Sequence, residues 1–357
     1  MTSDDAAPRP PEAATVASGP PSLPSFVAVA VPVLNEEAHV EACLASLMPQ
    51  CPPDRAEVLV LDGGSADRTR EIVAALAARH PNLRLLANPG RLQAAAVNLA
   101  ARVARPEAAV LVRADAHALY PPGFVARVAG EIGARGATSV VVPMRTVGEA
   151  DGLHRAIAAA QNARFGNGGA AHRAGAASGW VDHGHHAAFD RAHFLTLGGY
   201  DEAFSHNEDA EFDARSRAAG GRVWMCAEAA VDYVPRRTLG ALARQYTKHG
   251  AGRARTLAKH GLRPRPRQMA PVAALLGNTT ALLAAPLLPT ALAIPALYTI
   301  ACAVFGTTAA WRARDPALLA AGAAAAVMHH AWAFGFLRGR IRAARVSPGV
   351  LRPRESG

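Results

Sequence analysis

The feature that most constrains this chain is a stretch of 44 residues, 268–311, that contains no Asp, Glu, Lys or Arg. A second uncharged run of 22 residues follows at 316–337. Because about 20 apolar residues are enough to cross a bilayer as a helix, runs of this length are hard to house in the core of a soluble domain. We therefore predict C-terminal transmembrane helices within residues 268–337. The alternative is a set of buried core helices in a soluble protein.

Basic side chains are concentrated beside that region, although the chain as a whole carries a net charge of +10. Residues 1–235 hold 20 basic and 26 acidic side chains, whereas residues 236–267 hold ten basic side chains and no acidic one. A nucleic-acid binder usually spreads its basic face over the folded domain. A basic block next to an apolar run instead fits the anionic inner surface of a membrane. We predict a basic juxtamembrane segment at 236–267, a membrane as partner and no nucleic-acid partner.

Arginines after the second run indicate the orientation of the chain in the membrane. The segment 338–357 carries six arginines and one glutamate. By the positive-inside rule this segment is a basic cytoplasmic tail, so the number of spans is even. The simplest arrangement has one full span within 268–311 and a second at 316–337, with the surplus in the interface or re-entering. Three spans would fit the length better but would expel the six arginines.

Two further observations concern the cellular compartment. Residues 1–24 lack a continuous apolar core and are rich in Pro, Ala and Ser, so we predict a disordered tail rather than a signal peptide. The four cysteines are scattered and form no Cys-x-x-Cys pair, which suits a reducing compartment. They are Cys43, Cys51, Cys226 and Cys302.

Strand and helix patterns alternate from residue 25 to residue 235. Apolar runs at 26–33, 57–61, 83–86 and 108–112 predict strands, and the segments 35–48, 67–79 and 92–103 predict the helices between them. Such alternation predicts an α/β fold with a mostly parallel, Rossmann-like sheet and flanking helices. Ligands bind such sheets at the carboxyl ends of the strands. Polar residues gather there, at 35–36, 62–67 and 113–117.

Several of these segments resemble known motifs. Residues 29–37 read Val-Ala-Val-Pro-Val-Leu-Asn-Glu-Glu, and residues 61–69 read Leu-Asp-Gly-Gly-Ser-Ala-Asp-Arg-Thr. Both resemble the opening motifs of family 2 glycosyltransferases. The segments 113–117, 182–186 and 206–209 make the chain most similar to bacterial exopolysaccharide enzymes typified by succinoglycan glucosyltransferases. Together these motifs, in the right order over some 200 residues, form a specific signal.

The resemblance implies a fold and an activity. The region 25–235 is expected to be a GT-A glycosyltransferase domain. It would transfer a sugar, with inversion, from a nucleotide-sugar donor to a lipid-linked saccharide in exopolysaccharide biosynthesis. The best guess for the donor is UDP-glucose. A divalent metal, Mn²⁺ or Mg²⁺, is the implied cofactor. The implied location is the bacterial inner membrane, with the catalytic domain facing the cytoplasm.

The resemblance also implies which residues bind the donor. Seven are expected to contact the nucleotide sugar: Pro32, Asn35, Glu36, Asp62, Arg91, Arg113 and Asp115. Asp62 by itself would read as an ordinary turn residue, and Arg91 as a solvated surface arginine. Asp115 and His117 stand where the family usually has Asp-x-Asp, and are the expected metal ligands. Imidazole suits Mn²⁺ better than Mg²⁺, so the histidine leaves the metal preference open.

Catalytic and acceptor-binding residues are expected further along the chain. The resemblance favours Asp209 as the general base for the acceptor hydroxyl, with Glu208 as a neighbouring contact. Both would also serve as acids in the first turn of a helix. Trp180, His185 and His186 are expected to line the acceptor pocket, and a structural zinc site at the histidines of 183–186 is the weaker alternative.

Two other functions compete with this one. A processive polysaccharide synthase of the family would carry Gln-x-x-Arg-Trp, whereas residues 245–249 read Gln-Tyr-Thr-Lys-His. The Arg-Trp pair is missing, which argues against polymerisation. A catalytically inactive, membrane-anchored binding protein is the alternative from another class. The presence of Glu36, Asp115 and Asp209 argues against it.

Overall fold

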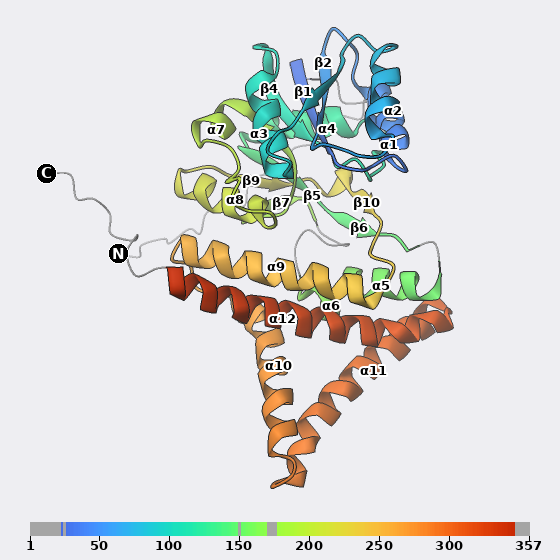
Figure 1. Cartoon of the computed structure of the whole chain (residues 1–357), viewed down its shortest axis with the longest axis vertical. Helices are drawn as coiled ribbons and strands as arrows, with labels where there is room; N and C mark the ends of the chain where they lie inside the picture. Colours follow the sequence, from blue (N-terminus) through green and yellow to red (C-terminus); the bar gives the residue numbers. More distant parts are fainter. Residues whose placement is uncertain (1–22, 24–25, 149–150, 170–176, 347–357) are drawn as a thin grey trace, which may run out of the picture.

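The computed structural model describes residues 23, 26–148, 151–169 and 177–346. The predicted disordered tail at 1–24 lies almost wholly outside the described residues, as does the tail beyond residue 346. Figure 1 shows an α/β domain resting on two long helices, from which two further helices project.

The centre of the α/β domain is an eight-stranded sheet in the order β3-β2-β1-β4-β8-β5-β9-β7. The four strands from β3 to β4 pair in parallel, as the sequence pattern predicted. β8 runs antiparallel to both of its neighbours. The strands are β1 Phe26–Val33, β2 Ala56–Asp62, β3 Leu83–Ala87, β4 Ala108–Arg113, β5 Ser139–Val142, β7 Gly179–Val181, β8 His185–Asp190 and β9 Val223–Met225.

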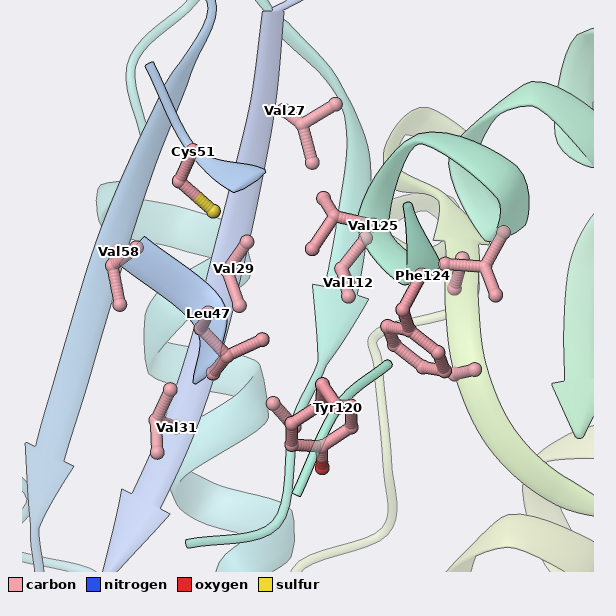
Figure 2. Close-up of a cluster of buried hydrophobic side chains, with 14 of the residues drawn as sticks. Val27, Val29, Val31, Leu47, Cys51, Val58, Val112, Tyr120, Phe124 and Val125 are labelled. Atoms are coloured by element: carbon pink, nitrogen blue, oxygen red, sulfur yellow. The ribbon is translucent and has the colours of Figure 1, made fainter. Parts of the chain in front are cut away.

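Helices cover both faces of this sheet because its central strands are apolar on both sides. In β1, Val27, Val29 and Val31 face one cluster, where Leu47 and Phe124 pack against them (Figure 2). The intervening alanines of β1 face a second cluster built on the other helices. The flanking helices are α1 Val40–Leu47, α2 Thr69–Ala77, α3 Gln93–Val103, α4 Phe124–Arg135, α7 Arg191–Thr196 and α8 Glu208–Ala218.

The first helix begins later than its pattern predicted. We expected a helix from residue 35, but α1 starts at Val40. Asn35 adopts a positive φ of 56°, and the carbonyl of Glu36 accepts the N–H groups of His39 and Val40. The segment between β1 and α1 is therefore a turn, which leaves the polar residues after β1 free to meet the neighbouring loop.

A small second sheet joins the α/β domain to the helices after it. It pairs β6 Met144–Thr146 in parallel with β10 Val231–Tyr233. Two helices, α5 Gly152–Asn162 and α6 Arg164–Asn167, follow β6 and lie beside the long C-terminal helices (Figure 1).

Four helices make up the C-terminal part: α9 Leu239–Lys259, α10 Pro266–Ala284, α11 Ala293–Ala313 and α12 Ala321–Val346. In Figure 1, α9 and α12 lie side by side beneath the α/β domain, while α10 and α11 project away and meet at a tip near residues 285–292. Among the described residues, two helical stretches are long and apolar enough to cross a membrane, Pro289–Ala313 and Pro316–Ala343. The uncharged run at 268–311 covers most of α10 and of α11, and only the second candidate span lies beyond it.

Close backbone contacts hold α9 against α12. A Cβ placed on Gly250 of α9 would lie 2.0 Å from the carbonyl oxygen of Trp332, and one on Gly335 of α12 would lie 2.0 Å from that of Thr247. A hydrophobic cluster shared by α5, α9 and α12 flanks this contact. The helix pair is thus packed closely together and against α5.

Candidate active site

Two polar loops meet at the carboxyl ends of β1 and β2. The carboxylate of Asp62 accepts the backbone N–H groups of Gly64, at 3.2 Å, and Ser65, at 3.1 Å. Asn35 donates its N–H to the Ser65 hydroxyl, and its side-chain oxygen accepts the N–H of Ala66. Asp62 therefore shapes the turn, and Asn35 ties the two loops together.

The other residues expected near the nucleotide lie around the same edge. Pro32 is paired with Leu61 in the register of β1 and β2, one position before Asp62. Arg91 has a positive φ of 57°, and its guanidinium lies 3.8 Å from the position of a Cβ built on Gly64. The structure thus brings Arg91 to the turn that Asp62 shapes, although the two are far apart in the sequence.

Asp115, just after β4, is the centre of a polar network. Its carboxylate accepts a hydrogen bond of 2.7 Å from Gln93 and lies 3.3 Å from the Arg113 guanidinium. Burial alone would raise the pKa of Asp115, but Arg113, His185 and His117 hold it well below its usual range. Asp115 is therefore ionised. The sequence analysis missed Gln93; its position at the first turn of α3, beside the carboxyl ends of the strands, was the available signal.

Arg113 links this network to the first turn of α8. Its side chain is buried and lies 3.7 Å from the carboxylate of Glu208 as well as next to Asp115. It also donates to the hydroxyl of Tyr200 at 3.4 Å. One buried cation therefore bridges two acids that are 93 positions apart.

The two histidines near Asp115 have different partners. His117 contacts the Glu36 carboxylate through Nδ1 at 3.1 Å, and this hydrogen bond raises its pKa. His185 places Nε2 3.4 Å from Oδ2 of Asp115, and burial lowers its pKa to about 4, so the ring is neutral at pH 7. The structure therefore brings His185 close to Asp115, whereas the Nδ1 atom of His117 faces Glu36.

This donor set fits one divalent cation. A neutral imidazole and a carboxylate are both suitable ligands for Mn²⁺. Adjacent ligands bound at about 2.1 Å lie about 3 Å apart, close to the separation of His185 Nε2 and Asp115 Oδ2. Among the described residues, no group of three His, Cys, Asp or Glu side chains surrounds a common point. A metal here would therefore need oxygen ligands from a bound diphosphate or from water.

Glu208 and Asp209 begin α8 after Asn207, which has a positive φ of 66°. Burial and the neighbouring Asp209 raise the pKa of Glu208. Burial would also raise the pKa of Asp209, but His186, Arg113 and the N–H of Ala210 hold it below its usual value. Asp209 therefore stays ionised at neutral pH and can accept a proton.

Two of the residues expected in the acceptor pocket lie elsewhere. His186 is 1% exposed, and its ring nitrogens contact the Tyr200 hydroxyl at 2.7 Å and the Asp213 carboxylate at 2.8 Å. It faces the core because side chains alternate along β8. Trp180 lies on the edge strand β7, with the Arg222 guanidinium 3.6 Å from its ring centre, and does not line the cavity described next. Of the three, only His185 lies at the cavity.

A cavity of about 730 Å³ lies between the α/β domain and the C-terminal helices. At one end it is lined by His185, Glu208 and Asp209, and at the other by residues of α10, α11 and α12. The sequence analysis did not predict this cavity, since its two ends come from parts of the chain that carried separate patterns.

The comparison with solved structures shows that the fold is that of GT-A glycosyltransferases. A mannosyltransferase from Pyrobaculum calidifontis, solved with GDP-Man and Mn²⁺, matches 91% of this chain and 89% of its own, with a TM-score of 0.56 and 22% sequence identity. This confirms the α/β fold predicted from the sequence.

The comparisons of sequence identify the family. The profile of glycosyl transferase family 2 matches residues 28–198. The succinoglycan biosynthesis protein ExoA of Rhizobium meliloti is 43% identical over 311 residues, which is 87% of this chain and 93% of that protein. The glycosyltransferase AglE of Haloferax volcanii is 40% identical over 62 residues, 17% of this chain and 20% of that protein. The chain belongs to glycosyltransferase family 2 and is an enzyme of that family, as the motifs indicated.

Proposed function

We propose that the enzyme moves one sugar, with inversion, from a nucleotide-sugar donor to a hydroxyl of a lipid-linked oligosaccharide during exopolysaccharide assembly. The observation that carries this proposal is the single cavity that joins Asp209 to the apolar C-terminal helices. The 43% identity to a succinoglycan biosynthesis protein supports the same process. UDP-glucose is the proposed donor, by resemblance to the succinoglycan glucosyltransferases.

The proposed donor side is the edge formed by the loops after β1, β2 and β4. Pro32, Asn35, Glu36, Asp62 and Arg91 would hold the nucleotide there. Asp115 and His185 would hold a divalent cation, which neutralises charge on the diphosphate. Arg113 keeps Asp115 ionised and fixes its orientation through the contact of 3.3 Å. In this arrangement the anomeric carbon of the donor would face the cavity that Asp209 lines.

Asp209 is the proposed general base, and it lines the cavity. The acceptor oxygen forms a bond to the anomeric carbon, its proton passes to the Asp209 carboxylate, and the bond from that carbon to the diphosphate oxygen breaks on the opposite face. Glu208, paired with Arg113, positions the start of α8. A base of this kind contributes about 10²- to 10⁴-fold to the rate.

We also propose that the α10–α11 hairpin is the part inserted in the bilayer, from the cytoplasmic side of a bacterial inner membrane. Leu287, at the tip, is 94% exposed, and the hairpin carries no acidic or basic residue from 268 to 311. α9 carries five Lys or Arg residues and packs along α12. If α12 crossed the bilayer, it would carry these charges into the hydrocarbon region, which is costly. We therefore place both helices in the interface. This revises the second span expected at 316–337 and keeps the even count.

The test uses membranes that contain the enzyme, Mn²⁺, a panel of nucleotide sugars and a prenyl diphosphate-linked saccharide. We expect transfer from UDP-glucose, with the anomeric configuration inverted in the product. Asp209→Asn should lower turnover by about 10²- to 10⁴-fold and leave the affinity for UDP-glucose unchanged. Glu107→Gln, at an exposed acid before the amino end of β4, is the matched control. Full activity of Asp209→Asn would remove Asp209 from the mechanism and point to Glu208.

A further inference from the structure

The cavity changes character along its length. Near the sheet its wall is acidic, with Glu208 and Asp209. Near the projecting helices it is lined by apolar side chains, among them Ala274 of α10, Ala301 of α11 and Met328 of α12. A ligand that fills the whole cavity must therefore be polar at one end and apolar at the other.

Three arginines, Arg164, Arg253 and Arg267, also line this cavity. Arg253 lies 3.0 Å from the Nε2 atom of His183, and Arg267 donates to the carbonyl of Gly169 at 2.9 Å. Within the described part of the chain, no ion pair joins any of the three arginines to a carboxylate. The cavity thus holds a group of cations, two of which contact an imidazole ring and a backbone carbonyl rather than a carboxylate.

Such a group is costly unless an anion joins it. Burial lowers the pKa of Arg253, and the nearby Arg267 and Arg265 lower it further, against the opposing effect of Asp209. Burial, followed by Arg265, likewise lowers the pKa of Arg267. Arg253 and Arg267 are half-buried and Arg164 is exposed. Partial burial removes hydration from the first two, like charges repel each other, and a bound phosphate relieves both costs. The planar guanidinium fork is also suited to bidentate contacts with phosphate oxygens.

We propose that Arg253 and Arg267, assisted by Arg164, bind the phosphate of the lipid-linked acceptor. The acceptor's lipid chain would lie between α10, α11 and α12, and its sugar would point towards Asp209. This assignment rests on the proposed function for the class of acceptor. It adds the residues that recognise the phosphate and the path of the lipid.

The donor diphosphate is a less suitable occupant of the arginine group. Of the two residues proposed to hold the donor's cation, Asp115 does not line the cavity, whereas His185 lines it together with Asp209. A general base lies on the acceptor side of the reacting carbon, opposite the leaving group. We therefore assign the arginines, which line the cavity together with Asp209, to the acceptor.

A binding experiment tests the site without any turnover. The full chain in detergent, with UDP and Mn²⁺ saturating the donor side, is titrated with farnesyl diphosphate and, separately, with farnesol. We expect the diphosphate to bind more tightly than the alcohol. Arg253→Gln or Arg267→Gln should weaken diphosphate binding roughly tenfold to a hundredfold, the range for losing a charge-assisted contact. Arg263→Gln, an exposed arginine in the same segment, should bind as the wild type does. Unchanged binding in both cavity variants would overturn the proposal.

Kinetics then separate this proposal from its alternatives. With a prenyl diphosphate-linked sugar, the two variants should raise the KM for the acceptor and leave the KM for the donor unchanged; Arg253→Lys should restore part of the loss. A raised KM for the donor instead would assign the arginines to the donor and overturn the proposal. An equal loss of binding to anionic phosphatidylglycerol vesicles would assign them to the membrane surface and also overturn it.

The binding and transfer measurements also distinguish a failure of the proposed phosphate site from a failure of the proposed function. If farnesyl diphosphate binds through both arginines but no sugar is transferred to a prenyl-linked acceptor, the phosphate site stands and the proposed function fails. If transfer occurs and both arginine variants retain the wild-type KM for the acceptor, the proposed function stands and the phosphate site fails.

Discussion

Asp115 illustrates how one side chain depends on residues distant in the sequence. Gln93 comes from α3, Arg113 from β4 and His185 from β8, and all three contact its carboxylate. Together they keep a buried acid ionised, which a low-dielectric site would otherwise oppose. A strand-end position predicts an acid at this edge, but only the assembled sheet brings in its partners.

The first prediction distinguishes the two candidate metal ligands. Because His185 lies beside Asp115 while His117 contacts Glu36, His185→Ala should weaken Mn²⁺-dependent donor binding about tenfold or more, the loss typical when a ligand's contact is removed. His117→Ala should have a smaller effect. Titration calorimetry of UDP binding with and without Mn²⁺ measures both. A larger loss in His117→Ala would restore the original expectation that Asp115 and His117 form the pair.

The second prediction concerns pH. Since burial holds the pKa of His185 at about 4, against 6.5 for a free histidine, the unfolded chain binds a proton that the folded chain does not. Stability should therefore fall as the pH drops from about 6.5 to 4, by about 1.4 kcal/mol per pH unit. Thermal unfolding in detergent should show a shallower decline for His185→Asn, and equal slopes would contradict the assignment. His117 acts in the opposite direction: its raised pKa adds stability that is lost as the pH rises above about 6.5.

Sequence patterns identified the acids of the site better than its histidines. Asp115, Glu208 and Asp209 lie close to one another, as their positions at strand and helix ends indicated. His185 and His186, by contrast, are adjacent in the chain, and the alternation along β8 sends one to the site and the other to the core. That choice depends on the register of β8 against β4 and β5, which a single sequence does not reveal.

At the scale of elements, the pairing of α9 with α12 places the cavity. Their closest approach occurs where glycines allow the two backbones to come together. Small residues serve this purpose widely in packed helix pairs near membranes. Composition predicted an apolar segment and a basic segment; it did not predict that the two would pack against each other, because that contact depends on which faces meet.

The third prediction tests this packing. Gly335→Val should push α12 away from α9, since the Cβ would lie 2.0 Å from a backbone oxygen that cannot move freely. We expect a fall in stability of about 1–3 kcal/mol, the usual cost of overpacking, together with a loss of transfer. Gly240→Ala on α9, whose nearest neighbour is the end of the Arg244 side chain at 3.7 Å, is the control. Unchanged unfolding and transfer in Gly335→Val would show that the close approach is not required.

For the molecule as a whole, the sequence predicted two regions, and the structure adds how they are joined. The parallel strands and the GT-A fold followed from apolar strands and short motifs. The direction of the last helices relative to the membrane could not be predicted in this way, because mean hydropathy is similar in a helix that crosses a bilayer and in one that lies along it. α12 is long and apolar enough to cross a bilayer. It nevertheless packs beside the basic helix α9, so its tertiary contacts decide its position.

The fourth prediction concerns that arrangement. If the α10–α11 hairpin returns to the side from which it started, a reporter fused after Gly357 should give cytoplasmic fluorescence and no alkaline phosphatase activity. Phosphatase activity at the C-terminus would establish an odd number of spans and contradict the hairpin.

The position of α12 also affects the order in which the enzyme can be assembled. The α/β domain, α9 and the hairpin all leave the ribosome before α12 does, yet α12 supplies Met328 and Trp332 to the cavity. Until that helix docks on α9, the chain has its carboxylates but no closed chamber between them and the lipid. The hairpin is therefore synthesised before the cavity can be completed, and a chain released early would hold the acids of the site without the α12 wall of the cavity.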